Sequence, residues 1–173
     1  MPMVDLTMTP GALDDETKQE LAGELARILL DFEAAPFTHF GHEEHMQALS
    51  WCFISEQEVF MGGLRHDRPA YRVVLTVPEG APVFGPLAAR IRAKMFKRVT
   101  EAVLAAEGTE PTMAEAHRVW VQLRHIVDTQ WGGFGEVITI NDLREYAFEK
   151  GEPGSKSARM HEAALASVRS VAQ

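Results

Sequence analysis

The spacing of apolar residues along the chain changes from the period of a strand to that of a helix. Residues 3–8, Met-Val-Asp-Leu-Thr-Met, form a short apolar run that ends at the turn residues Pro10-Gly11. From about residue 14 to residue 32 the apolar residues recur at helical spacing, and Asp14 or Asp15 can cap the start. The pattern predicts a strand and then an amphipathic helix whose core stripe is Leu21, Leu25, Ile28 and Leu29.

The same order of elements returns in the second half of the chain. There we expect a strand over Arg72–Val77 and a helix from about Gly85 to Ala106. A second strand follows each helix, and a helix between two strands usually makes them parallel. The remaining predicted elements are second strands near 47–55 and 117–126, edge ribbons near 59–61 and 137–140, a linker at 151–154 and a final helix at 155–172.

The two halves also match residue by residue at an offset of 69 positions, which indicates an internal duplication. Leu6-Thr7-Met8 falls on Leu75-Thr76-Val77, Trp51 falls on Trp120, and Gly62-Gly63 falls on Gly132-Gly133 after a one-residue insertion. We therefore predict an α/β (α+β) fold. Two tandem β-α-β repeats form one four-stranded mixed sheet with two helices on one face, and a C-terminal helix follows. The predicted divisions are 1–69, 70–150 and 151–173, within one structural domain overall.

Composition and charge exclude several classes of protein. The net charge is −8 and the chain has no run of Lys or Arg, so neither nucleic acid nor an anionic membrane is expected as a partner. The longest apolar stretches are too short to span a bilayer, and the first residues lack the pattern of a signal peptide. With Cys52 as its one cysteine, the chain is expected to be cytoplasmic, and we expect Cys52 to pack as a small apolar residue.

A duplicated β-α-β chain that begins Met1-Pro2 resembles the tautomerase superfamily. The opening segment 2–8 is similar to the first strand of that family. Segment 58–63, Glu-Val-Phe-Met-Gly-Gly, resembles the glycine turn of its cis-3-chloroacrylic acid dehalogenase branch. Segment 128–135, Asp-Thr-Gln-Trp-Gly-Gly-Phe-Gly, resembles its malonate semialdehyde decarboxylase branch. The resemblance covers roughly residues 2–140 and implies a homotrimer, in which three sheets bury their uncovered faces together.

The resemblance also implies a catalytic role for Pro2. Removal of Met1 leaves Pro2 with a free secondary amine, and burial of such an amine lowers its pKa from a reference value near 8. An amine of this kind is suited to general acid–base catalysis on a small keto or enol acid. At the offset of 69, Pro2 falls on Tyr71, whose nitrogen is an ordinary peptide nitrogen. We therefore expect one catalytic pocket and one degenerate pocket in each chain.

Several other residues are candidates for binding the substrate, which we expect to be a carboxylate. Arg124 is our candidate for holding the carboxylate, and Arg72 is a second, with a surface position or a subunit salt bridge as the alternative for each. Trp131 and Phe134 are expected to form an apolar pocket wall or a subunit interface. Gln130, Glu44 and His45 complete the candidate set, Gln130 and Glu44 because they fall near acidic residues of the two branches. Trp51 and Trp120 are interpreted as packing residues.

The favoured function is keto–enol tautomerisation without a cofactor. Hydratase or decarboxylase action of the same superfamily is the first alternative, and a catalytically inactive trimeric binding protein is the second. The turns at 9–12 and 78–82 contain no Arg or Lys where the known branches hold a substrate carboxylate, and this favours the inactive alternative. His39, His42 and His45 are spaced by three, but no Cys or Asp joins them at ligand spacing, so we expect no metal site.

Overall fold

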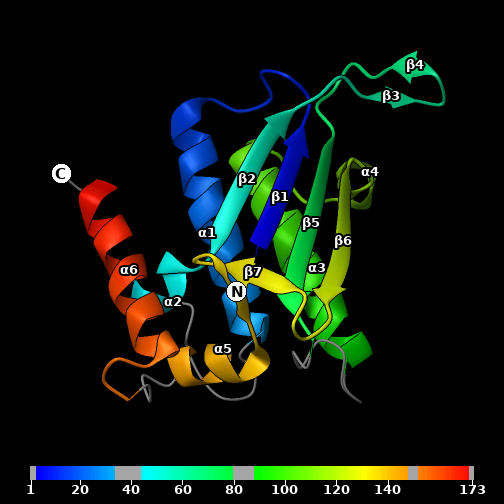
Figure 1. Ribbon diagram of the computed structural model, residues 1–173. Helices are drawn as coiled ribbons and strands as arrows, with labels where there is room; N and C mark the ends of the chain where they lie inside the picture. Colours follow the sequence, from blue (N-terminus) through cyan, green and yellow to red (C-terminus); the bar gives the residue numbers. More distant parts are fainter. Residues whose placement is uncertain (1–2, 34–43, 80–87, 148–151, 172–173) are drawn as a thin grey trace.

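The computed structural model describes residues 3–33, 44–79, 88–147 and 152–171. Its strands and helices follow the predicted order, with several short elements between the long ones (Figure 1). In chain order they are β1 (Met3–Met8), α1 (Asp15–Glu33), α2 (Glu44–Ala48), β2 (Trp51–Glu56), β3 (Phe60–Met61), β4 (Leu64–Arg65), β5 (Tyr71–Pro78), α3 (Ala88–Ala106), α4 (Met113–Ala116), β6 (Val119–Ile126), β7 (Trp131–Gly133), β8 (Glu136–Ile138), α5 (Ile140–Ala147) and α6 (Lys156–Val171).

Four strands form one mixed sheet in the order β2-β1-β5-β6. The strands β1 and β2 are parallel, β5 and β6 are parallel, and the central pair β1 and β5 is antiparallel. Each parallel pair is joined through a long helix, α1 or α3, as expected for a right-handed β-α-β crossover. The predicted fold class, two β-α-β repeats in one mixed sheet followed by a C-terminal helix, is confirmed.

The strand registers reproduce the duplication. Met3 pairs with Trp51 in the first repeat, and Arg72 pairs with Trp120 in the second. Both partners in the second pair lie 69 positions after those in the first, as the sequence predicted. The two repeats meet at the antiparallel pair Asp5–Val74, whose members are also related by the offset of 69. Because of this symmetry, the starts of β1 and β5 lie at opposite ends of the sheet.

The helices α1 and α3 cover one face of the sheet, and the main core lies between them and the strands (Figure 1). Alternate residues of each strand point into this core, including Val4, Leu6 and Met8 of β1. The predicted stripe of α1 is buried against them. Asp14 caps α1 by accepting a hydrogen bond from Thr17 N at 2.8 Å, and this bond holds the pKa of the Asp14 carboxyl below its ordinary value.

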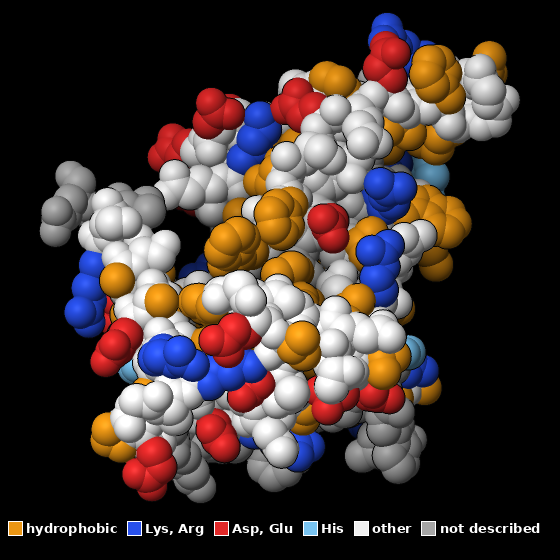
Figure 2. All heavy atoms as spheres, in the orientation of Figure 1, with side chains coloured by type: hydrophobic (Ala, Val, Ile, Leu, Met, Phe, Trp, Pro, Cys, Tyr) orange, Lys and Arg blue, Asp and Glu red, His pale blue; other side chains and the backbone are white. Residues whose placement is uncertain are grey.

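The other face of the sheet carries large apolar side chains that no described residue covers. Trp51 is 57% exposed, Phe53 is 48% exposed and Trp120 is 70% exposed. Figure 2 shows hydrophobic side chains gathered over this face beside isolated charged ones. The expectation that both tryptophans pack within the chain is wrong. They alternate along their strands with core residues such as Cys52 and Val121, so their side chains point away from the core.

A second, smaller apolar cluster lies where β1 begins. Its buried members are Leu49, Trp131, Ile138, Tyr146, Met160 and Ala164, and Met3 packs against it. The cluster is built by α2, the β7–β8 hairpin, α5 and α6, which Figure 1 shows grouped at that end of the sheet. At the start of α5, Thr139 N donates to Asp142 Oδ2 at 2.7 Å and Asp142 N donates to Thr139 Oγ1 at 3.2 Å. This reciprocal pair is a capping box that fixes the direction of α5.

Three short segments differ from the prediction. Residues 44–48 form the helix α2, and the second strand begins only at Trp51, because Met46 and Leu49 face the second cluster at helical spacing. The ribbons near 59–61 and 137–140 belong to separate hairpins, β3–β4 and β7–β8, rather than to the main sheet. The hairpin turn of the second repeat is Phe134-Gly135, whereas Gly132-Gly133 lies within β7. None of the helices in the described part of the chain has the length and hydrophobicity needed to cross a bilayer.

Candidate functional site

The described chain begins at Met3, the first residue of β1, and Pro2 lies outside the described residues. Met3 occupies the end of a central strand, between Trp51 of β2 and Thr76 of β5. It also packs against the second cluster. A site that uses Pro2 would therefore lie close to Met3.

Trp131 is the bulkiest buried member of that cluster and its most unusual one. The residue is only 8% exposed, and its indole Nε1 has no hydrogen-bond partner among the described residues. A buried N–H group without a partner costs about 1–3 kcal/mol, so such groups are normally met by water or a ligand. The sequence predicted Trp131 as an apolar wall. It did not predict this unused donor, because a hydrogen-bond partner depends on tertiary packing.

The two candidate arginines lie at opposite ends of the sheet. Arg124 is beside Thr76, which in turn is beside Met3, so its Cα lies about 10 Å from that of Met3 at ordinary strand spacing. The Arg124 side chain is on the uncovered face and forms no ion pair with another described residue. Arg72 instead pairs with Thr7, four residues further along the sheet from the Met3 end. Within one chain, the structure brings Arg124 to the level of Met3 and separates Arg72 from it.

The remaining predicted residues occupy the same end of the molecule but point in different directions. Glu44 is exposed at the start of α2, whereas His45 is buried with its Nε2 at 3.5 Å from Ala147 O. Gln130 is exposed just before β7. Phe134 is at the tip of the hairpin with a φ of +55°, and its side chain is half exposed. Of the residues proposed as an apolar wall, only Trp131 therefore belongs to the second cluster.

Further polar groups at this end were missed by the sequence analysis. Glu33 ends α1 and is half-buried, its Oε2 is shielded from solvent, and burial raises the pKa of its carboxyl above the ordinary value. The rings of His45, Tyr146 and His161 lie 5.4 to 5.6 Å apart, and Tyr146 Oη donates to His45 O at 2.5 Å. The three ring residues come from three different helices, and no local sequence pattern connects them.

Metal-binding groups are absent from the described residues. No three His, Cys, Asp or Glu side chains in the described ranges lie close enough together to hold a metal ion. Of the three histidines spaced by three, His39 and His42 lie outside the described residues, and His45 is buried against α5 and α6.

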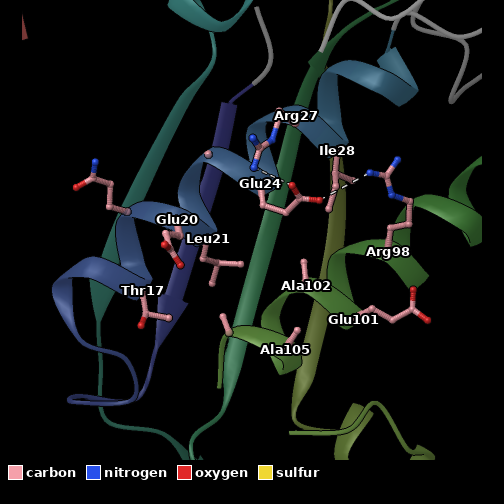
Figure 3. Close-up of a pocket in the computed structure, with 13 residues that line it drawn as sticks. Thr17, Glu20, Leu21, Glu24, Arg27, Ile28, Arg98, Glu101, Ala102 and Ala105 are labelled. Carbon is pink, nitrogen blue, oxygen red and sulfur yellow. Dashed lines mark ion pairs between the residues drawn. The ribbon is translucent and has the colours of Figure 1, made fainter. Parts of the chain in front are cut away.

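A hollow lies on the other side of the molecule, between α1 and α3 (Figure 3). It has a volume of about 920 Å³, and its floor includes Ala102 and Ala105. On its rim, Glu24 pairs with Arg27 at 2.9 Å and with Arg98 at 3.8 Å. This hollow is remote from Met3, and none of the candidate site residues lines it.

Comparison with known proteins connects this geometry to a fold family. No protein-family model matches the chain, and no curated protein matches its sequence. Solved structures do match over most of the chain. N1, a member of the cis-3-chloroacrylic acid dehalogenase family, has a TM-score of 0.66 and 14% identity over 92% of this chain and 99% of its own. Pt0534 inactivated by 2-oxo-3-pentynoate has a TM-score of 0.59 and 16% identity over 82% of this chain and 98% of its own.

A third similar structure is a fused 4-OT that forms a symmetric trimer. It has a TM-score of 0.57 and 18% identity over 87% of this chain and 99% of its own. These proteins are all members of the tautomerase superfamily, and the chain has the fold that they share. The resemblance that the sequence predicted is therefore confirmed at the level of the fold. At such low identity the chemistry has to be argued from the site itself.

Proposed function

We propose that the protein is an enzyme of the tautomerase type, in which the amine of Pro2 acts as general base and acid on a small keto or enol acid. The observation that carries the proposal is the position of Met3. It begins a central strand and packs on an apolar cluster, and Pro2 is the residue that directly precedes it in the sequence. The shared fold supports the same conclusion.

The chemistry requires one group that first accepts and then returns a proton. A secondary amine in an apolar environment is less easily protonated than in water, which makes it a base near neutral pH. In the proposed step, Pro2 nitrogen takes the proton from the enol oxygen and delivers it to the carbon next to the one that bears this oxygen. The carbon–carbon double bond becomes single and the oxygen becomes a carbonyl. No atom is gained or lost, and no cofactor is needed.

Arg124 and Trp131 are the groups proposed to hold the substrate. Arg124 has no carboxylate partner among the described residues, so its guanidinium is available for a substrate carboxylate. The unused Nε1–H of Trp131 is a donor for an oxygen on which negative charge develops. The apolar second cluster, to which Trp131 belongs, would exclude water from the reacting atoms.

We also propose that the protein acts as a homotrimer. Trp51 and Phe53 of β2 and Trp120 of β6 are exposed on the sheet face that α1 and α3 do not cover, and large exposed apolar side chains on such a face favour a contact with another subunit. Three such faces can cover one another around a closed axis. One structure with the same fold is described as a symmetric trimer, which supports this arrangement.

The proposal is tested by kinetics after the N-terminus has been defined. Intact-protein mass spectrometry shows whether Met1 is removed, and phenylenolpyruvate and 2-hydroxymuconate are then supplied as enols. We expect turnover that is lost in Pro2→Ala and weakened mainly in KM by Arg124→Gln. Equal rates for wild type and Pro2→Ala would refute the proposal. An absence of turnover together with retained ligand binding would favour the inactive trimeric binding protein, and product formation by hydration or decarboxylation would favour the first alternative.

A further inference from the structure

A second pocket lies at the other end of the sheet, where β5 begins. It has a volume of about 410 Å³, within the range of small-molecule sites, and it is lined by residues from β1, the segment before β5 and the start of β6. Among them are Thr7, Arg72, Trp120 and Gln122. By the duplication, this pocket is the counterpart of the Met3 end.

The two ends of the sheet carry different chemistry at equivalent positions. Met3, Ala48 and Leu49 at the first end belong to or pack on the apolar second cluster. The residues 69 positions later are Arg72, His117 and Arg118, and all three line the second pocket. The duplication has therefore placed apolar side chains at one end and arginine and histidine side chains at the equivalent positions of the other.

The second pocket lacks the group that would perform catalysis. Tyr71 occupies the position that corresponds to Pro2, and its backbone nitrogen is a peptide nitrogen that donates to Arg118 O at 2.8 Å. Tyr71 also lines the pocket, and its hydroxyl, which is shielded from solvent, has no partner among the described residues. A ligand in this pocket would meet donors but no titratable backbone amine.

Arg118 cannot serve as the ligand-binding cation of this pocket. Its side chain is 1% exposed, and its five N–H donors are all used by Glu107, Glu115 and the carbonyl of Pro69. The resulting ion cluster supports the pocket from beneath. It leaves no spare positive charge for a ligand.

Arg72, in contrast, is available. It is exposed, and its hydrogen bond to a described residue is from Nη2 to the neutral Thr7 Oγ1 at 3.3 Å. No carboxylate of the described chain lies within ion-pair distance of it. The adjacent Gln57 and Gln122 can donate through their amides, and Val59, Met61 and Trp120 provide apolar walls. A guanidinium beside amide donors and an aromatic ring suits a small carboxylate that has an apolar body.

We infer that the second pocket is a separate binding site for a small organic carboxylate, held by Arg72 and not turned over. The site does not depend on the proposed catalysis, because it uses no group at the Met3 end, although its wall residue Trp120 also lies on the face proposed to form the trimer. If both hold, each chain binds two carboxylates, one that reacts and one that does not.

The test is calorimetric titration of the full-length assembled protein with cinnamate, an aromatic carboxylate that has no keto–enol proton to transfer. In the Arg124→Gln variant we expect one molecule bound per chain. Adding Arg72→Gln should weaken this binding about 10- to 100-fold, the effect of losing a charge-assisted pair of hydrogen bonds. In the same Arg124→Gln background, Arg72→Lys should bind less tightly than the unchanged Arg72, because lysine keeps the charge but loses the forked pair of hydrogen bonds of the guanidinium.

Arg27→Gln is the matched control, since it removes an exposed arginine on the helical face and should leave binding unchanged. The inference is overturned if Arg72→Gln leaves the affinity unaltered, or if Arg124→Gln alone abolishes all binding. It is also overturned if Arg72→Gln changes the sedimentation coefficient without changing the affinity, because Arg72 would then be a subunit contact. A protein that binds cinnamate through Arg72 but turns over no enol would contradict the proposed function and leave this site intact.

Discussion

Replacing Glu107 by Gln gives a stringent test of how the second repeat is held together. Glu107 accepts two hydrogen bonds from the buried Arg118, at 3.1 and 2.7 Å, and its side chain is only 11% exposed. The substitution keeps the shape of the side chain but removes the negative charge. Arg118 is then left with Glu115 as its remaining carboxylate partner.

The expected cost follows from the burial of the pair. Removing one partner of a buried ion pair costs about 3–5 kcal/mol, and the retained contact with Glu115 places this case near 3 kcal/mol. For a chain of this size, 1 kcal/mol corresponds to about 2–4 °C in Tm, so the midpoint should fall by about 6–12 °C. Folding stability is the property affected, because Glu107 lies outside both proposed ligand sites.

The assay is thermal unfolding followed by circular dichroism, at one protein concentration because assembly also affects Tm. Glu101→Gln is the control. Glu101 forms an exposed i,i+4 pair with Lys97 at 3.6 Å, which is worth no more than about 0.5 kcal/mol. If the two variants melt together, the buried ion cluster does not stabilise the start of β6 and the reasoning is refuted.

Three further outcomes follow from the structure. Asp142→Asn should destabilise α5 and α6 by about 1 kcal/mol. Burial opposes ionisation of Asp142, but its bonds to Thr139 and Lys156 hold the carboxyl pKa below the ordinary value. The Asp142 carboxylate therefore stabilises the fold at pH values above its ordinary pKa, and this stabilisation is lost as pH falls through the lowered pKa. Because the variant lacks this carboxylate, its stability should fall less steeply in acid than that of wild type. Burial raises the pKa of the Cys52 thiol to about 11, so its reaction with a disulfide reagent at pH 8 should be much slower than that of a free cysteine; an equal rate would contradict the burial. Phe53→Lys on the uncovered face should shift sedimentation from trimer to monomer, and an unchanged coefficient would exclude this face as the trimer contact.

The sequence predicted the long elements of the fold well. The strand β1 matches its predicted bounds, and the helix α1 is displaced by one residue, because both have clear periodicity and recognisable end signals. The duplication was predicted from a few matched residues, and the strand registers reproduce its offset. Short elements were harder, since a few apolar residues near 44–50 fit a helical turn as well as a strand.

The candidate site was predicted less completely. The duplication alone does not say whether the central strands run parallel or antiparallel, and the antiparallel pairing of β1 with β5 is what separates Arg72 from Met3. Trp51 and Trp120 were interpreted as packing residues because both repeats retain them, although their alternation with core residues places them on the uncovered face. Groups that act through tertiary surroundings, such as Trp131 Nε1 and the buried carboxyl of Glu33, leave no signal in a single sequence.

The account depends most on the amine of Pro2 being free and reactive. Incubation with 2-oxo-3-pentynoate, the inactivator named for one protein of the same fold, tests this directly. The nitrogen of a free amine adds to the alkyne carbon furthest from the ketone, and a proton then reaches the neighbouring carbon, so the whole reagent is retained. We predict one molecule of reagent per chain, mapped by peptide mass spectrometry to the Pro2 nitrogen and absent in Pro2→Ala. A chain that keeps Met1, or labelling that is the same in Pro2→Ala, would contradict the account.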